Sequence, residues 1–431
     1  MTSQKLSRVK SRSLFPNKGY DVFYLLICVV LLIHSFSVLY HKIVQGAGTA
    51  VVDNLYNFAG GFVRRGLGGE IVFFLQDSLG IPIAVPIYLS SLVAYSFLVW
   101  ISISYFRKKG YGINVLIMGF ALGGVLVHGF DSYRRDFVEL AFLAVTLLSF
   151  TRLTVAKWLV LGNLITMFGI ALHEATFFFT VPVLILIANL RIRNIWKSLC
   201  AWLPSIIVFA VCCICKGSPD MVSPIIGRAM EYAPECFPGG EVPWLLKFIG
   251  FDTETVVKMH LNINFFDIGV LKGFPVPAFL ITLVYFVYIP YCMVAMLIAF
   301  TPGGLRNGER NRLVRIVVFQ FICLIPMFTV LSCDLARVSC YWIMSSLLVW
   351  LIIDRNDQIG LFRSGYDRLM DMVSTKLFSK WIPGRMSLTI LMLIIGVTYV
   401  TRNVRSVLKS SIGYDLVTIL EETFDSILTV I

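Results

Sequence analysis

The stretch WLVLGNLITMFGIALHEATFFFTVPVLILIANL, residues 158–190, decides how this chain is threaded. Its only ionisable residues are His173 and Glu174, near the middle. A single helix of this length would be roughly 50 Å long, well beyond the ~30 Å hydrocarbon core of a membrane. The stretch therefore favours two short spans with a turn at His173 and Glu174, and one long tilted helix is the alternative.

Whether residues 158–190 form a hairpin or one helix decides on which side of the membrane every later loop lies. Lys and Arg concentrate in the cytoplasmic loops of membrane proteins. The hairpin gives the cytoplasmic segments a clear excess of Lys and Arg, whereas the single helix leaves the two sides nearly equal. With the hairpin, the outer surface consists of residues 41–80, the turn 128–136, the His173–Glu174 apex, residues 216–273 and the turn 333–337.

The whole chain is as apolar as this stretch suggests. Of its 431 residues, 58% are hydrophobic and 14% charged, whereas soluble domains have roughly 45–50% apolar and about 25% charged residues. We predict an all-α fold: a polytopic transmembrane helical bundle of about 11 spans. Residues 1–431 form one integral membrane domain, with 216–273 as a large extracytoplasmic capping loop. The spans are expected near 22–40, 81–105, 112–130, 137–151, 158–172, 175–190, 198–215, 274–300, 316–332, 338–354 and 387–400.

Composition also excludes several classes of function. The net charge of +12 comes from basic residues scattered over loops, so no nucleic-acid partner is expected. Most of the ten cysteines lie in apolar runs, and no disulfide framework is implied. The basic N-terminal segment leads into an apolar segment without a cleavage site, which indicates a retained first helix with a cytoplasmic N-terminus. Metal-ligand spacing is not found, so we expect no metal and no cofactor.

Four segments carry the candidate chemistry. The first, DNLYNFAGGFVRRGLGGE (residues 53–70), places Arg64 and Arg65 among glycines, where the backbone can approach a ligand closely. Guanidinium forks match phosphate and pyrophosphate. The alternative is an interfacial loop whose arginines reach lipid headgroups. Asp53 opens the segment and is a candidate base.

The second segment is HGFDSYRRDFVEL, residues 128–140. Arg135 and Glu139 are four residues apart and are expected to pair on one helix face, leaving Arg134 to point elsewhere. Cations at a helix start oppose the helix dipole, which favours a functional role. Asp131, just before the helix, is another candidate base.

The third and fourth segments are LHEATFFFTVP and SCDLARVSCYW. Ionisable residues at membrane depth usually line a site or a pathway, although a lone histidine is often only a satisfied polar residue. Neighbouring helical positions diverge by about 100°, so His173 and Glu174 should serve different roles. Asp334 and Arg337, at i and i+3, either belong to the site or form a local ion pair.

The order of these motifs, YRRDFVEL, then LHEATFFFTVP, then LARVSCYW, resembles the Wzy and EpsG type of bacterial polysaccharide polymerases over roughly residues 50–350. The resemblance implies a glycosyltransferase of the bacterial inner (plasma) membrane. It would join polyprenyl-pyrophosphate-linked oligosaccharides on the outer face, with Arg135, His173 and Arg337 in its site. Glu174 departs from the small polar residue expected after the histidine.

The resulting hypothesis gives each residue a role. Pyrophosphate would be held by Arg64, Arg65, Arg135 and Arg337, with Arg134 and Asp334 nearby. His173 is the first choice of general base, because its ordinary pKa lies near neutral pH; Asp53, Glu174 and Asp131 are alternatives. Partners would be the lipid-linked oligosaccharide, membrane lipids and a candidate chain-length regulator. The rivals are a transporter or flippase for an anionic or lipid-linked substrate and, less favoured, a structural subunit.

Overall fold

The computed structural model describes residues 49–108, 135–251, 253–266, 268–271, 274–277, 279–280, 307–332 and 335–353. These ranges are helical apart from one short antiparallel ribbon, which confirms the expected helical class. The predicted spans 22–40, 112–130 and 387–400 lie outside them, and so does the predicted span 274–300 apart from residues 274–277 and 279–280. The longer elements are α3 (Gly66–Leu79), α4 (Ala84–Lys108), α6 (Asp136–Arg152), α7 (Val155–Leu172), α8 (Thr176–Ile192), α9 (Ile195–Ala201), α10 (Leu203–Ile214), α11 (Pro219–Tyr232), α13 (Thr253–Leu261), α16 (Asn307–Pro326) and α17 (Leu335–Ile352). The short ones are α2 (Thr49–Asp53), α12 (Trp244–Lys247), η1 (Pro234–Cys236), η2 (Pro238–Gly240), η3 (Phe248–Gly250), η4 (Asn262–Phe266), η6 (Met327–Leu331), β1 (Ile268–Leu271) and β2 (Phe274–Pro277).

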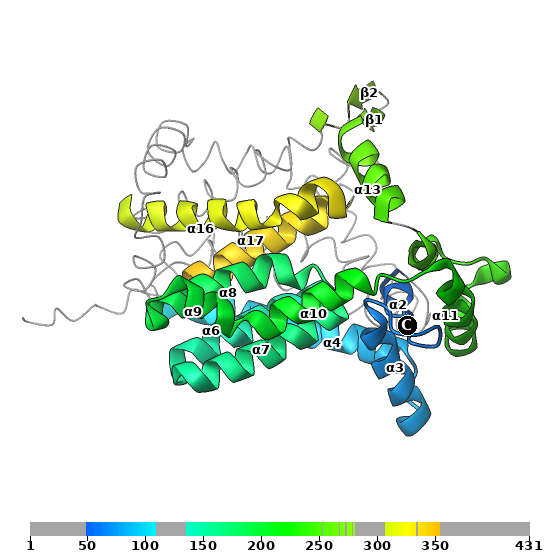
Figure 1. Cartoon of the computed structure of the whole chain (residues 1–431), viewed down its shortest axis with the longest axis horizontal. Coiled ribbons are helices and arrows are strands. Elements are labelled where there is room, and N and C mark those ends of the chain that lie inside the picture. The colour runs from blue at the N-terminus through cyan, green and yellow to red at the C-terminus, as the bar shows by residue number, and fades with distance from the viewer. Residues whose placement is uncertain are drawn as a thin grey trace, which may run out of the picture.

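The apolar helices form an elongated bundle, in which α4, α6–α10, α16 and α17 run side by side (Figure 1). In the described ranges, three helical stretches are long and apolar enough to cross a membrane: Ala84–Ser102, Val155–Leu172 and Arg312–Leu331. A fourth results if α9 and α10, bent by 57° at Trp202, count as one span. Membrane-spanning character is therefore supported, whereas the expected number of about 11 spans is not confirmed.

The stretch 158–190 is a hairpin. Helix α7 ends at Leu172, His173 is extended, and α8 begins at Thr176. At the far end of α8, Arg191 donates hydrogen bonds to the carbonyl oxygens of Phe150 (2.5 Å) and Leu153 (2.8 Å), beside the start of α7. The two helices therefore run in opposite directions, with His173 and Glu174 at the turn.

Two predicted segments need correction. The glycine-rich segment 53–70 lies in the outer segment 41–80, where no helix is predicted, but from Gly66 onward it belongs to helix α3. Residues 274–277 were expected to begin a span, but they form strand β2, which pairs with β1. The sequence there is FPVP, and proline has no amide hydrogen to donate within a helix.

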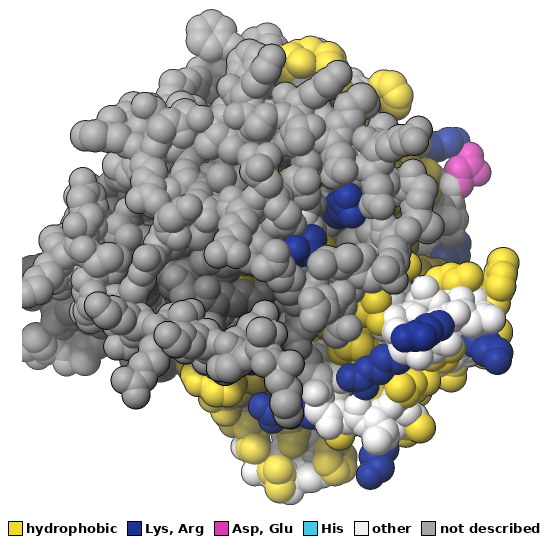
Figure 2. Space-filling view, turned by 90° about the vertical axis from the view of Figure 1, so that its left-hand side faces the viewer, with side chains coloured by type: hydrophobic (Ala, Val, Ile, Leu, Met, Phe, Trp, Pro, Cys, Tyr) yellow, Lys and Arg dark blue, Asp and Glu magenta, His cyan; other side chains and the backbone are white. Residues whose placement is uncertain are grey.

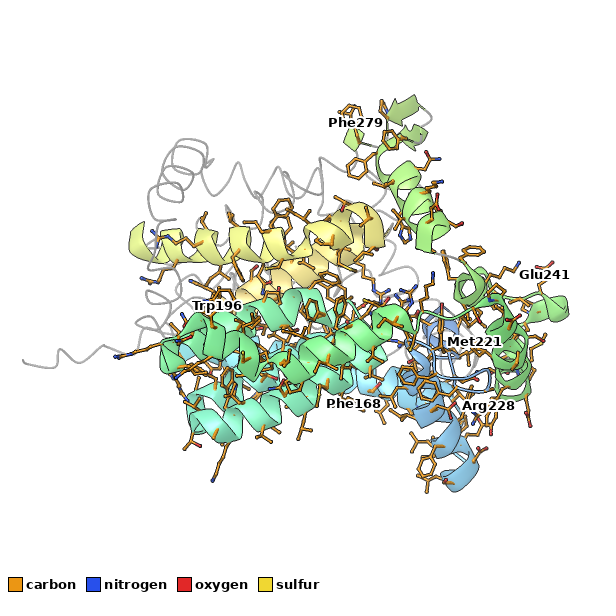
Figure 3. The ribbon with its side chains drawn as sticks, in the orientation of Figure 1. Phe168, Trp196, Met221, Arg228, Glu241 and Phe279 are labelled. Atoms are coloured by element: carbon orange, nitrogen blue, oxygen red, sulfur yellow. The ribbon has the colours of Figure 1, made fainter. Side chains whose placement is uncertain are left out.

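A second, smaller apolar core lies at one end of the bundle. It combines residues 51–88 with residues 225–249 of the predicted capping loop, whose described residues are largely helical. Figures 1 and 3 show α2, α3 and α11 together beyond the bundle, with Met221 and Arg228 on the α11 side. A Cβ at Gly60 would lie 2.7 Å from the carbonyl oxygen of Met221, so α11 packs directly on the glycine-rich segment.

Glycine at position 69 is required by this packing. A Cβ there would lie 1.9 Å from the carbonyl oxygen of Tyr56, closer than any real contact. We expect Gly69→Ala to lower the free energy of unfolding by roughly 1–3 kcal/mol, the usual cost of overpacking. Gly227→Ala is the matched control, since its Cβ meets nothing within 4 Å in helix α11, and it should stabilise by about 0.4–1 kcal/mol. Thermal unfolding in detergent measures both, and equal effects would contradict the packing argument.

The other end of the bundle is basic. Around the α6–α7 and α8–α9 junctions lie Arg152, Lys157, Arg191, Arg193 and Lys197. Figure 2 views the molecule from this side, and basic side chains recur over its described surface while acidic ones are scarce. Trp196 lies at this end and is 73% exposed, as expected for an aromatic anchor at a membrane interface (Figure 3).

Candidate functional site

Charged side chains from four distant segments meet at the end of the bundle that carries α2 and α3. This is where α6 and α17 begin and α7 turns into α8. Nitrogen-tipped side chains gather at this junction in Figure 3. The residues with mutual contacts are Asp53, Arg64, Arg65, Arg135, Asp136, Glu139, His173, Glu174, Arg337 and Tyr341. We call this set the junction cluster.

Arg135 holds the cluster together from the inside. It is 4% exposed, and its guanidinium donates to the carbonyl oxygens of Leu172 and Asp53. Its Nε lies 3.9 Å from Oδ2 of Asp53. The predicted pairing of Arg135 with Glu139 is therefore wrong. The guanidinium ties α6 to the α7–α8 turn and to α2, because buried carbonyl oxygens left without donors are costly.

Arg337 approaches the same centre from α17. Its Nε donates to Oδ1 of Asp136 at 2.5 Å, and Tyr341, one turn further along α17, donates its hydroxyl to the same oxygen. The Nη2 atom of Arg337 lies 3.9 Å from Oδ2 of Asp53. Asp136 therefore accepts from two side chains of α17 and links the starts of α6 and α17.

Arg64 and Arg65 form the outer part of the cluster. Arg65 grips Glu174 with two bonds, from Nε to Oε2 at 2.9 Å and from Nη2 to Oε1 at 2.5 Å. Nη1 of Arg64 lies 3.5 Å from the same Oε1. Arg65 adopts φ of 67° just before α3, in the left-handed region that costs a non-glycine residue roughly 1–3 kcal/mol. Such strain is common at ligand sites.

His173 lies between the inner and outer arginines. Its Nδ1 accepts the Ala175 amide hydrogen at 3.1 Å, and its Nε2 is 3.4 Å from Nη2 of Arg337. A neutral imidazole has one accepting nitrogen, so both contacts cannot be hydrogen bonds at once. The shorter one assigns the resting proton to Nε2. The proton would have to move to Nδ1 before Nε2 could accept a proton from a substrate.

Glu139 is the least expected member of the cluster. Its side chain is fully buried, and within the described residues no hydrogen bond reaches either carboxyl oxygen. Its Oε1 lies 4.0 Å from Nδ1 of His173, and Tyr341 is another neighbour. Burying a carboxyl group without hydrogen bonds is expensive. A position that costs stability in this way is typical of a functional residue.

The electrostatics of the turn favour a neutral histidine beside an ionised glutamate. Burial and then the Arg65 charge hold the pKa of His173 well below its ordinary value of 6.5. Burial would raise the pKa of Glu174, but Arg65 and Arg64 outweigh it and hold that pKa well below 4.5. The same ion pair acts on Arg65. Burial alone would lower the pKa of the Arg65 guanidinium, but the Glu174 charge outweighs burial and raises that pKa.

Stability should therefore fall in acid. Both pKa values are lower in the folded chain, so between the folded and unfolded values the unfolded chain binds more protons and stability rises with pH. For His173 the loss begins as pH drops below 6.5, and for Glu174 as it drops below 4.5. Thermal unfolding in detergent from pH 8 to 3 measures this. His173→Gln should flatten the step near pH 6.5 while leaving the acidic one; an unchanged profile would contradict the burial argument.

The candidates predicted from sequence fall into two groups. Asp53, Arg64, Arg65, Arg135, His173, Glu174 and Arg337 all belong to the junction cluster, whereas Asp131, Arg134 and Asp334 lie outside the described residues. His173 and Glu174 diverge as expected, since Glu174 meets Arg65 and His173 meets Arg337. Asp136, Glu139 and Tyr341 were missed as site residues. Asp136 and Glu139 are three apart on α6, a signal that YRRDFVEL contained.

The described residues include no group of three or more His, Cys, Asp or Glu side chains placed to hold a metal ion. The junction cluster instead combines four guanidinium groups with four carboxyl groups, a set suited to binding anions and moving protons. Comparison of the chain with protein-family models, curated proteins and solved structures finds no match.

Proposed function

We propose that this chain is a membrane glycosyltransferase that polymerises polyprenyl-pyrophosphate-linked oligosaccharide units on the outer face of a bacterial inner membrane. The observation that carries the proposal is the meeting of the four candidate segments in one cluster. Arg65 and Glu174 are 109 residues apart in sequence, and Arg337 and Asp136 are 201 apart. Scattered interfacial anchors would have no reason to meet in this way.

The charge of the bundle supports the proposed orientation. Lys and Arg near the ends of spans favour the cytoplasmic side. The end with Arg152, Arg191 and Lys197 would then face the cytoplasm, and the junction cluster would face outward. Lipid-linked oligosaccharides assembled on the outer leaflet would reach the cluster from that side.

The cluster suggests a division of labour. The more accessible arginines, Arg64, Arg65 and Arg337, would receive the pyrophosphate of the donor. As the bond between the anomeric carbon and the pyrophosphate oxygen breaks, negative charge grows on the leaving group, and preorganised guanidiniums stabilise it. Arg135 would act indirectly, since its guanidinium is engaged by the carbonyl oxygens of Leu172 and Asp53.

The acceptor sugar must lose a proton as its hydroxyl oxygen attacks the anomeric carbon. We assign this proton to Nε2 of His173, which is neutral because its pKa is lowered by burial and by Arg65. That role needs the tautomer with a proton on Nδ1. Glu139, 4.0 Å from Nδ1, would accept a hydrogen bond from it and is the proposed positioning residue.

The test uses purified protein in liposomes with a lipid-linked oligosaccharide and resolves the products on a gel. We expect wild type to give a ladder of polymers, and His173→Ala and Arg337→Ala each to lose it. Arg228→Ala is the matched control, because Arg228 pairs with Glu70 at 2.8 Å outside the junction cluster. Normal ladders from both His173→Ala and Arg337→Ala would rule the proposal out.

The second candidate is a transporter or flippase for an anionic or lipid-linked substrate. Fully buried Glu139 favours it, since ionisable groups inside helical bundles also form ion pathways. The same liposomes separate the two functions. Translocation of the lipid-linked substrate without formation of a glycosidic bond would favour the transporter.

A further inference from the structure

Glu174 occupies the place where the proposed function, on which this inference rests, requires a phosphate. Its carboxylate lies between two guanidinium groups, 2.5 Å from Nη2 and 2.9 Å from Nε of Arg65 and 3.5 Å from Nη1 of Arg64. A planar fork binds carboxylate and phosphate oxygens with the same geometry. A ligand phosphate and the Glu174 carboxylate therefore compete for one pair of arginines.

We infer that Glu174 is an internal stand-in for the substrate diphosphate: it fills the Arg64–Arg65 fork in the empty site and swings out when the diphosphate enters. The carboxylate then acts as a latch that lowers the affinity for small anions. A lipid-linked diphosphate, held also by its lipid and sugar, displaces it more readily.

The fork is accessible, whereas the inner arginine is not. The side chains of Arg64 and Arg65 are 29% and 20% exposed, and that of Glu174 is 15% exposed. Arg135 is 4% exposed and holds backbone carbonyl oxygens that cannot leave without unfolding the turn. An incoming anion can therefore exchange with Glu174 at the fork without disturbing the inner contacts.

The position of Glu174 permits this movement. It belongs to the turn between α7 and α8, so its side chain can change rotamer without breaking a helix. Its backbone carbonyl oxygen accepts the Phe177 amide hydrogen at 3.1 Å, which keeps the turn in place as the side chain moves. The exchange replaces one anion by another, so the two guanidiniums keep a counter-charge throughout.

The test is a titration of inorganic pyrophosphate into the full chain in detergent by calorimetry. Glu174→Gln removes the competing charge and should tighten binding about tenfold, the change for one charge-assisted contact of roughly 1.4 kcal/mol. Glu70→Gln is the matched control and should leave the affinity unchanged. Glu70 also pairs with an arginine, Arg228, at 2.8 Å, with side chains of similar exposure, but away from the fork.

Several outcomes would overturn the inference. They are an affinity that is unchanged or weaker in Glu174→Gln, no pyrophosphate binding by wild type or variant, and an equal gain in Glu70→Gln. Adding Arg65→Gln to Glu174→Gln should cancel the gain, and a gain that persists would place the anion elsewhere. Size-exclusion profiles and thermal unfolding of each variant confirm that it is folded.

The source of the phosphate group is tested with anionic lipid. Pyrophosphate affinity that survives micelles doped with phosphatidylglycerol supports a diphosphate ligand. Affinity abolished by that lipid would assign the fork to ordinary headgroups and overturn the inference. Failure of the proposed function is a separate result. A chain that forms no glycosidic bond could still bind pyrophosphate more tightly as the Glu174→Gln variant. Conversely, a working polymerase could show no change in pyrophosphate affinity in that variant.

Discussion

Replacing Arg135 by alanine should lower the free energy of unfolding by roughly 3–5 kcal/mol, the range for breaking a buried charged contact, and should abolish activity. The substitution leaves the carbonyl oxygens of Leu172 and Asp53 without their donor in a buried place. It also removes a positive charge 3.9 Å from the Asp53 carboxylate. The α7–α8 turn would then lose its link to α6 and α2.

Arg191 provides the matched control for Arg135. It also donates to two backbone carbonyl oxygens, those of Phe150 and Leu153, but it is exposed and at the opposite end of the bundle. Arg191→Ala should cost about 1 kcal/mol or less and leave activity intact. Arg135→Lys should recover only part of the stability, because an ammonium group lacks the planar fork that reaches two acceptors. Equal losses in Arg135→Ala and Arg191→Ala, measured by thermal unfolding, would contradict the proposed role.

The sequence predicted the two helices of the hairpin well because their signal is local. Apolar runs of sufficient length placed α7 and α8 within a few residues, and the His173–Glu174 pair marked the turn between them. The glycine-rich segment was misjudged for a physical reason. Glycines weaken an isolated helix, but in α3 they let the helix approach the backbone of Tyr56 closely, a tertiary gain invisible in local sequence.

Seven of the ten residues of the junction cluster were candidates from the sequence, but their pairing was not predicted. Motifs with several ionisable residues in an apolar chain pointed to Arg65, His173 and Arg337. Partners were assigned by local spacing, so Arg135 was paired with Glu139 four residues away. The fold instead directs Arg135 to backbone carbonyl oxygens, which sequence patterns do not distinguish, and Glu139 toward His173.

Arg135 and Glu139, which are paired by their sequence spacing, are expected to have opposite effects on the stability of the fold. Arg135 stabilises the fold, whereas Glu139 is buried with its carboxyl oxygens unbonded within the described residues, at a cost to stability. Glu139→Gln should therefore leave the thermal unfolding temperature unchanged or raise it, while the turnover rate falls by about 100-fold or more. The variant would then be at least as stable as wild type but less active, as at functional sites whose residues lower the stability of the fold.

The kinetic pattern distinguishes positioning of His173 from a structural effect of Glu139. If Glu139 holds the His173 tautomer that can accept a proton, Glu139→Gln should lower kcat with little change in KM. Glu139→Asp should restore part of kcat, because a carboxylate can only accept from Nδ1, whereas the amide of glutamine can also turn its NH2 group toward Nδ1 and stabilise the other tautomer. A parallel fall of stability and activity in Glu139→Gln, with no rescue by Glu139→Asp, would show that Glu139 only supports the packing of α6. The general base would then have to be sought among the carboxylates, beginning with Asp53, which lies 3.9 Å from both Arg135 and Arg337.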